Sequence, residues 1–222
     1  RFGGGRSGGR PGTNTFFGGG AAPRVFFSRR IGLESGQTVP IQGGGRLTGK
    51  AGDFTIGALN IQTDDALGVD ASATNFTVLR LKRDILRRSS IGAMFTGRSV
   101  ALGGVSASQA YGVDGAFAFF ANVAINTYWA RTRTDGSSSD ATSYRIQFDY
   151  DADRYGARFE RLVVGDRFNP EVGFVRRDNM RRSLAQLRFS PRTRNHPTVR
   201  RLSWVGDMDY VETTDGRLET RE

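Results

Sequence analysis

The sequence predicts an all-β protein whose strands follow one another as an antiparallel, up-and-down meander. Two observations lead to this fold class. Apolar and polar residues alternate within many short segments, and the connections between these segments are alternately short and long. The composition agrees, because 30 glycines among 222 residues supply turn chemistry, whereas lysine and glutamate, which favour helices, are sparse beside arginine and aspartate.

The alternation is clearest in segment 144–151, YRIQFDYD, where aromatic or aliphatic residues alternate with charged or amide residues. Successive side chains of a strand point to opposite faces, so this segment is expected to be a strand with one apolar and one charged face. Comparable patterns predict ten strands, and residues 216–222 could begin a further one. The ten are 41–50, 54–63, 76–84, 90–100, 112–120, 123–133, 142–150, 155–164, 180–190 and 200–212.

The connections predict how these strands are used. Short connections near residues 52, 87, 122 and 153 alternate with long ones at 64–75, 101–111, 134–141 and 165–179. Short turns at one rim and long loops at the other are typical of outer-membrane β-barrels, whose tilted strands need ~9–11 residues. Several aromatic residues also fall near strand ends, where a membrane–water boundary would favour them. These are Tyr128, Trp129, Tyr150, Tyr155, Trp204 and Tyr210.

The expected fold is therefore an antiparallel transmembrane β-barrel in the bacterial outer membrane. Residues 24–222 are expected to be an incomplete part of it, truncated at both ends. Residues 1–23 are Gly-rich and of low complexity, and are expected to be a flexible segment or loop. A spanning helix is excluded, because the most apolar stretch, 115–125, is far shorter than the ~20 residues that such a helix needs.

Catalytic and metal chemistry find little support in the sequence. The chain has no cysteine and one histidine, His196, so zinc sites and thiol nucleophiles are disfavoured. The glycine clusters lack the Lys-Ser/Thr pair of a phosphate loop. We expect no enzymatic activity, no cofactor and no metal. The net charge of +10 raises the possibility of nucleic-acid binding. Nucleic acid is disfavoured as a partner, because the arginines are scattered along the chain.

Five motifs are distinctive in their order and spacing. They are FFSRRIG at 26–32, GGRLTGK at 44–50, NFTVLR at 75–80, YGVDG at 111–115 and NPEVGFVRR at 169–177. Taken together, they resemble one protein family, the uncharacterised bacterial outer-membrane β-barrels whose members carry an N-terminal domain similar to family-nine carbohydrate-binding modules. The resemblance covers about residues 24–212 and implies a large barrel preceded by a β-sandwich domain and exported to the outer membrane. It carries over no catalytic residues.

Arginines close to aromatic residues form the candidate ligand site. Guanidinium groups bind oxyanions and aromatic faces stack on sugars, so they could gather acidic or sugar ligands. The alternative is that these arginines pair with aspartates inside a lumen, and Asp114 is expected to belong to such a polar network rather than to act as an acid–base catalyst. The candidate set is Arg29, Arg30, Arg80, Asp114, Arg176 and Arg177.

The sequence leaves two functions open. The first is an outer-membrane β-barrel, surrounded by outer-membrane lipid, that binds or translocates a glycan or other polymeric solute through a polar, Arg-rich lumen and long outer loops. The second is a soluble, secreted β protein that binds acidic polymers or nucleic acid through a basic face, with its aromatic residues in an ordinary β core.

Overall fold

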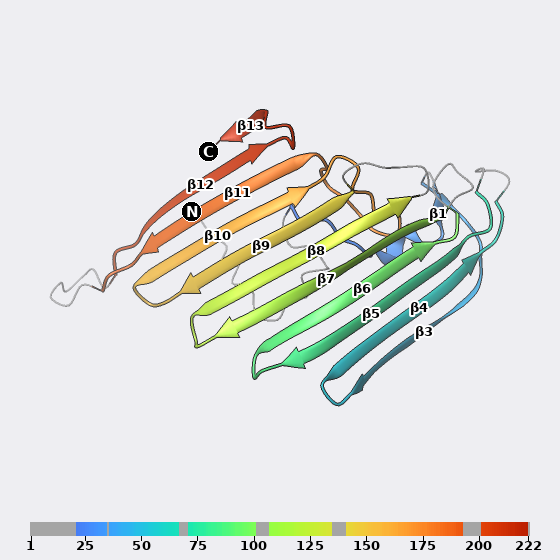
Figure 1. The fold of residues 1–222 in the computed structure, drawn as a ribbon, viewed down its shortest axis with the longest axis horizontal. Helices are drawn as coiled ribbons and strands as arrows, with labels where there is room; N and C mark the ends of the chain where they lie inside the picture. The colour runs from blue at the N-terminus through green and yellow to red at the C-terminus, as the bar shows by residue number, and fades with distance from the viewer. Residues whose placement is uncertain are drawn as a thin grey trace.

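The computed structural model describes residues 21–34, 36–66, 71–100, 107–134, 141–192 and 201–221. These residues form one large antiparallel sheet and a small hairpin of β1 (Leu33–Glu34) and β2 (Gln37–Thr38) (Figure 1). The strands of the large sheet are β3 (Ile41–Ala51), β4 (Phe54–Thr63), β5 (Asn75–Ile85), β6 (Ser89–Arg98), β7 (Ser108–Phe119), β8 (Val123–Thr134), β9 (Thr142–Asp151), β10 (Tyr155–Val164), β11 (Met180–Phe189), β12 (Trp204–Glu212) and β13 (Leu218–Arg221).

The sheet is a meander, because each strand pairs with its neighbours in sequence, in the order β13 to β3. The all-β, antiparallel, up-and-down architecture is confirmed, and each of the ten predicted strands is present with small shifts at its ends. The hairpin β1–β2 was not anticipated. Within the described chain, β3 and β13 are the two edges of an open sheet and do not pair with each other. A closed barrel is therefore not shown.

The two ends of the strands differ as the connection lengths predict. Tight turns join the strands at one end, which we call the short-turn rim, and the connections 64–74, 99–107, 135–141 and 165–179 lie at the other end, the long-loop rim (Figure 1). Two connections depart from this rule. The short connection 213–217, between β12 and β13, lies at the long-loop rim. Residues 190–203, between β11 and β12, form a long connection at the short-turn rim.

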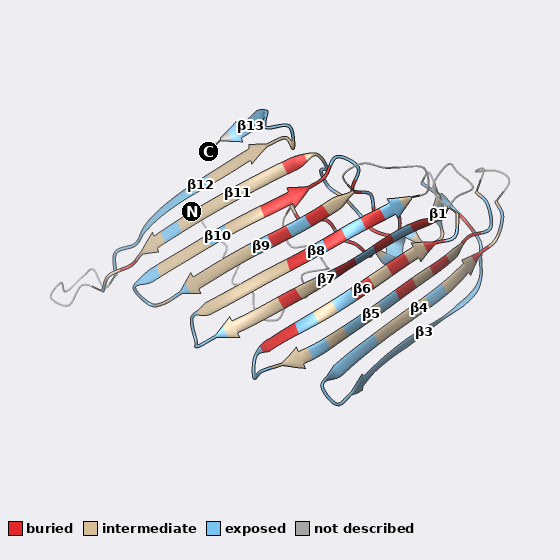
Figure 2. Cartoon of the chain, viewed as in Figure 1, coloured by how far each residue is buried: buried red, intermediate tan, exposed pale blue. Residues whose placement is uncertain are grey.

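The two faces of the sheet differ in chemistry. Directly paired residues share a face, so the register sorts the side chains. One face carries Leu79, Ile91, Val113, Ile146 and Phe159, all exposed, and we call it the apolar face. The opposite face holds most of the charged residues of the strands, and we call it the ion-pair face. Figure 2 shows how buried and exposed residues are distributed along the strands.

The packed core lies on the ion-pair face near the long-loop rim. There, residues 21–31 and the 165–179 connection cover the ends of the strands. Val25, only 1 % exposed, joins Phe168, Val172 and buried strand residues such as Leu162. Backbone hydrogen bonds link Arg24 with Phe174 in both directions. The packed part of the chain thus begins by Ala22, which is buried, and the rest of the predicted flexible segment, residues 1–20, lies outside the described residues.

A glycine permits this close approach. A Cβ atom on Gly173 would lie 2.1 Å from the Arg24 carbonyl oxygen and 2.7 Å from that of Val25. Any larger residue would push the two segments apart. In the part of the chain described, helical structure is limited to the 3-10 turn η2 (Ser28–Arg30), and no helix is long and apolar enough to cross a membrane.

Candidate functional site

The ion-pair face carries the charged groups that could meet a ligand. Its centre is the pair formed by Arg80 on β5 and Asp114 on β7. Arg80 Nη1 donates to Asp114 Oδ1 at 2.5 Å and Nη2 donates to Oδ2 at 2.9 Å. This is the bidentate geometry of a guanidinium–carboxylate pair, which fixes orientation as well as charge. Both side chains are largely buried, with 14 % and 6 % exposure respectively.

Arg80 on β5 and Asp114 on β7 meet across β6, the strand that lies between theirs. On β6, Gly92 is the direct cross-strand neighbour of Asp114 and of Lys82, and it lies beneath the pair. A Cβ atom at Gly92 would lie 2.6 Å from Arg80 Nη2 and 2.7 Å from Asp114 Oδ1. The absence of a side chain at Gly92 therefore makes room for the ion pair.

A second group of charges crosses four strands. Arg182 on β11 donates from Nε to Asp209 Oδ1 on β12 at 2.8 Å. Its Nη1 lies 3.6 Å from Glu160 Oε1 on β10, and Glu160 Oε2 in turn lies 4.0 Å from Arg145 Nη1 on β9. We call Arg145, Glu160, Arg182 and Asp209 the charge ladder. Because cations and carboxylates alternate along it, each arginine is held in place by its neighbours.

Smaller pairs continue this pattern toward the short-turn rim. Arg158 donates from Nε to Asp149 Oδ1 at 2.5 Å, and Arg188 donates from Nη2 to Asp151 Oδ1 at 2.7 Å. On the same face near the β3 edge of the sheet, Lys50 Nζ lies 3.5 Å from Asp84 Oδ2, and Lys82 Nζ lies 3.9 Å from Asp84 Oδ1. The ion-pair face is thus a lattice of paired charges.

The candidate residues predicted from the sequence fall into three regions, which are the Arg80–Asp114 pair, the turn η2 and the 165–179 connection. Arg80 and Asp114 pair with each other, as the polar-network interpretation of Asp114 required. Arg29 and Arg30 lie in η2 and are exposed, and neither forms an ion pair with another described residue. Among the described residues, no ion pair joins the first two of these regions.

Arg176 and Arg177 lie in the 165–179 connection beside a hollow of about 380 Å³ at the long-loop rim. Ala21, Met180 and Val211 supply its apolar wall, and Arg182 of the charge ladder also lines it. Arg177 pairs with Glu219. This hollow connects the predicted arginines to the ion-pair face.

Another ion pair attaches the β1–β2 hairpin to the large sheet. Arg98 on β6 donates from Nη2 to Glu34 Oε2 of β1 at 2.8 Å, and both side chains are mostly buried. Arg98 also lies over the ring of Phe76, 5.5 Å from its centroid. Glu34 thus anchors the N-terminal hairpin on the ion-pair face.

Sequence reasoning did not single out the charge ladder. Its residues lie at positions of one parity in segments whose other positions are mostly apolar or small, with Arg161, Arg181 and Glu212 as exceptions, so the period-two pattern already placed them on one face. The partner of each arginine was not deducible, because it depends on register and on the diagonal reach of the side chains.

No family model, curated protein or solved structure matches this chain. Across the described ranges, no group of three or more His, Cys, Asp or Glu residues is placed to hold a metal ion. The arrangement offers fixed, alternating charges and guanidinium donors, which suit the binding of polar or anionic groups.

Proposed function

We propose that the sheet is part of the wall of a transmembrane β-barrel of the outer-membrane type, with the apolar face toward lipid and the ion-pair face toward a polar lumen. The observation that carries this proposal is the apolar face itself. Val113, Ile146 and Phe159 are each about half exposed, at 53 %, 55 % and 47 %. An exposed apolar surface of this extent needs a nonaqueous partner.

The charges on the apolar face are distributed as a bilayer would require. On the apolar face of strands β4 to β12, Arg83 is the one charged residue near the short-turn rim. Its Cζ atom lies 5.1 Å from the centroid of the Phe54 ring. The others lie toward the long-loop rim, which leaves an uncharged band between them. These are Arg131, Arg133, Arg161, Arg181 and Glu212.

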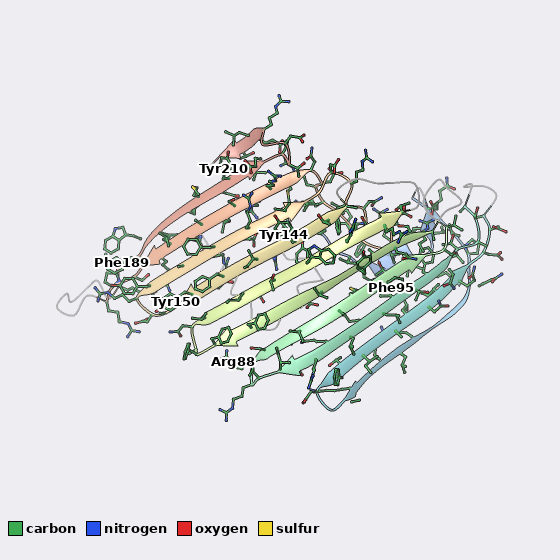
Figure 3. The ribbon with its side chains drawn as sticks, in the orientation of Figure 1. Arg88, Phe95, Tyr144, Tyr150, Phe189 and Tyr210 are labelled. Atoms are coloured by element: carbon green, nitrogen blue, oxygen red, sulfur yellow. The ribbon has the colours of Figure 1, made fainter. Side chains whose placement is uncertain are left out.

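Aromatic residues border this band on both sides. Toward the short-turn rim, the rings of Tyr155, Phe189 and Trp204 stack in series, with centroids 5.3 and 5.7 Å apart. Toward the long-loop rim lie Tyr111 and Trp129, whose rings are 6.2 Å apart. Figure 3 shows the side chains, with Phe95, Tyr144, Tyr150, Phe189 and Tyr210 labelled among those of the apolar face. Two aromatic belts around an apolar band are typical of transmembrane barrels.

One aromatic residue expected at the membrane boundary lies elsewhere. Tyr128 is on the ion-pair face, 3 % exposed, with its hydroxyl 3.0 Å from Ser143 Oγ. The sequence placed Tyr128 and Trp129 together, but neighbouring residues of a strand point to opposite faces, so one of the two had to turn inward.

The strand register also supports a barrel. One row of directly paired residues starts at Ala51, the last residue of β3, and passes through Arg83, Gly115 and Arg161. It ends at Tyr210, six residues beyond Trp204, where β12 begins. The short-turn rim is therefore oblique to the pairing direction. Closing a sheet into a barrel requires such a stagger, because the strands must tilt relative to the axis.

The ion-pair face would then line the lumen. Its paired arginines and carboxylates give a polar wall, and the hollow beside Arg176 and Arg177 lies at the long-loop rim, where a solute would first arrive. We propose that the solute is a glycan or another polar polymer. This choice rests on the family resemblance of the sequence and on the affinity of guanidinium and aromatic groups for sugars and anions.

The second candidate, a soluble protein that binds acidic polymers or nucleic acid, has weaker support. Most arginines of the ion-pair face already pair with carboxylates of the same face, which leaves little uncompensated charge there for phosphate binding.

Intrinsic tryptophan fluorescence tests the proposal. The chain has two tryptophans, and both lie exposed on the apolar face, Trp129 midway along β8 and Trp204 at the start of β12, at the short-turn rim. In vesicles made with lipids brominated on their acyl chains, the emission of both is expected to be quenched. Unquenched emission from a protein that stays monodisperse without detergent would overturn the proposal and favour the soluble alternative.

Cysteine labelling tests the orientation, because the chain has no native cysteine. Ala121→Cys lies exposed at the short-turn rim and Asp166→Cys lies exposed at the long-loop rim. In intact cells, a membrane-impermeant maleimide is expected to label only Asp166→Cys. Equal labelling at both positions would contradict the proposed topology.

A further inference from the structure

Two arginines on the apolar face stand apart from the paired charges of the sheet. Arg131 and Arg133 lie on β8 near the long-loop rim, and both are exposed. As alternate residues of one strand they share a face, with their Cα atoms about 7 Å apart. Neither guanidinium forms an ion pair with another residue of the described chain, whereas Arg161 on the same face contacts Ser183 and Glu212.

The residues around this pair of arginines form a consistent site. On β7, Tyr111 is the direct cross-strand partner of Arg131 and Gln109 is that of Arg133. On β9, Thr142 pairs with Arg131. In the strand register, residues with hydroxyl or amide side chains thus lie directly beside both arginines, and the Tyr111 hydroxyl and the Gln109 amide are groups of the kind that donate hydrogen bonds to anionic oxygens.

From the two arginines toward the short-turn rim, the next residues on the same face are aromatic and then aliphatic. Trp129, one step down the same face of β8, packs against Tyr111, and its cross-strand partner on β9 is Tyr144. Farther down lie Ile146 and Ile125 of the uncharged band. A molecule that meets the arginines would therefore have aromatic rings and then aliphatic side chains beneath its charged end.

We propose that Arg131 and Arg133 bind the phosphorylated headgroup of a membrane lipid whose acyl chains lie along the uncharged band. This inference rests on the proposed function. Guanidinium forks bind phosphate oxygens, and two arginines on one face of the same strand can contact the phosphate oxygens of one headgroup together. The aromatic rings mark the depth at which a headgroup meets the acyl chains. A free phosphate ion would use the arginines but not the apolar surface below them.

The test uses the full-length protein in vesicles of phosphatidylcholine that contain increasing amounts of bisphosphorylated lipid A or its dephosphorylated form. The wild-type protein is expected to enrich the bisphosphorylated lipid about 25-fold over the dephosphorylated form, because each of the two arginines contributes about fivefold. In the double variant Arg131→Gln/Arg133→Gln, enrichment is expected to fall by roughly fivefold for each arginine removed.

The matched control is Arg87→Gln/Arg88→Gln, which removes the same charge from exposed residues of the short-turn rim. The control is expected to keep the wild-type enrichment. Equal enrichment in the wild type and in Arg131→Gln/Arg133→Gln would overturn the inference, and so would an equal loss in the control. Complete competition by inorganic pyrophosphate would show that the site binds free phosphate and would overturn the lipid assignment.

Quenching by brominated lipids in the same samples separates the two proposals. Quenched tryptophans without headgroup enrichment would overturn this inference and leave the transmembrane wall standing. Absence of quenching would overturn both.

Discussion

Replacing Gly92 with alanine tests how the central ion pair is held. The new Cβ atom would lie 2.6 Å from Arg80 Nη2, 2.7 Å from Asp114 Oδ1 and 2.8 Å from Arg80 Cζ. Real Cβ contacts are longer, so the guanidinium and the carboxylate must both shift, which weakens their two hydrogen bonds. Removing one partner of a buried pair costs about 3–5 kcal/mol, but here both partners remain and only the flexible ends of their side chains move, so the cost is smaller, about 1–2 kcal/mol. Gly92→Ala is expected to lower the free energy of unfolding by about that amount.

Equilibrium denaturation monitored by tryptophan fluorescence measures this change. The control is Gly206→Ala on β12, where a Cβ atom meets nothing within 4 Å, and there we expect a gain of about 0.5–1 kcal/mol from the lower backbone entropy of the unfolded chain. In an Arg80→Ala/Asp114→Ala background, Gly92→Ala should cost nothing, because its contacts are gone. A cost that persisted in that background would refute the reasoning and point to the backbone of β6 instead.

Two further predictions concern the rims. Asp153 lies in a turn of the short-turn rim, and the hydrogen bond from Arg192 lowers the pKa of its carboxyl below the ordinary value. A lowered pKa means that this pair stabilises the fold above the unfolded pKa and that the contribution is lost as the pH falls. In Arg192→Gln, carboxyl NMR titration should show the Asp153 pKa moving up, and an unchanged titration would rule out the contact in solution. At the long-loop rim, Val25→Ala removes two buried methyl-sized groups and should cost about 1.5 kcal/mol. Limited proteolysis should then cut residues 21–34 faster than in the wild type, whereas an unaltered rate would show that Val25 does not hold the segment.

The strands could be predicted from the sequence because their signal is local. In β9, aromatic and aliphatic residues alternate with charged ones, and this period of two is enough to define a strand with two unlike faces. The short turns could be predicted equally well, since Gly52 with Asp53 and Ala152 with Asp153 are residue types that tight hairpin turns favour. The meander followed from these two signals together.

The candidate site was only partly predictable. Asp114 could be assigned to a polar network, but its partner Arg80 lies 34 positions away on a strand that is not its direct neighbour. The pairing depends on the register of three strands and on the missing side chain at Gly92, and no local pattern encodes this combination. The same holds for the charged residues of β11, whose placement on the two faces depends on register. The register places Arg182 and Arg188 on the ion-pair face and Arg181 near the long-loop rim.

The sequence by itself determined that this chain forms β-strands with one apolar and one polar side, joined alternately by tight turns and long loops, because side-chain alternation and turn propensity act over a few residues. Only the tertiary structure decided which charges meet, that Tyr128 turns inward while Trp129 faces outward, and that residues 21–31 pack on the ion-pair face. Those outcomes depend on strand register and on contacts between segments far apart in the chain, which are settled by the packing of the whole sheet.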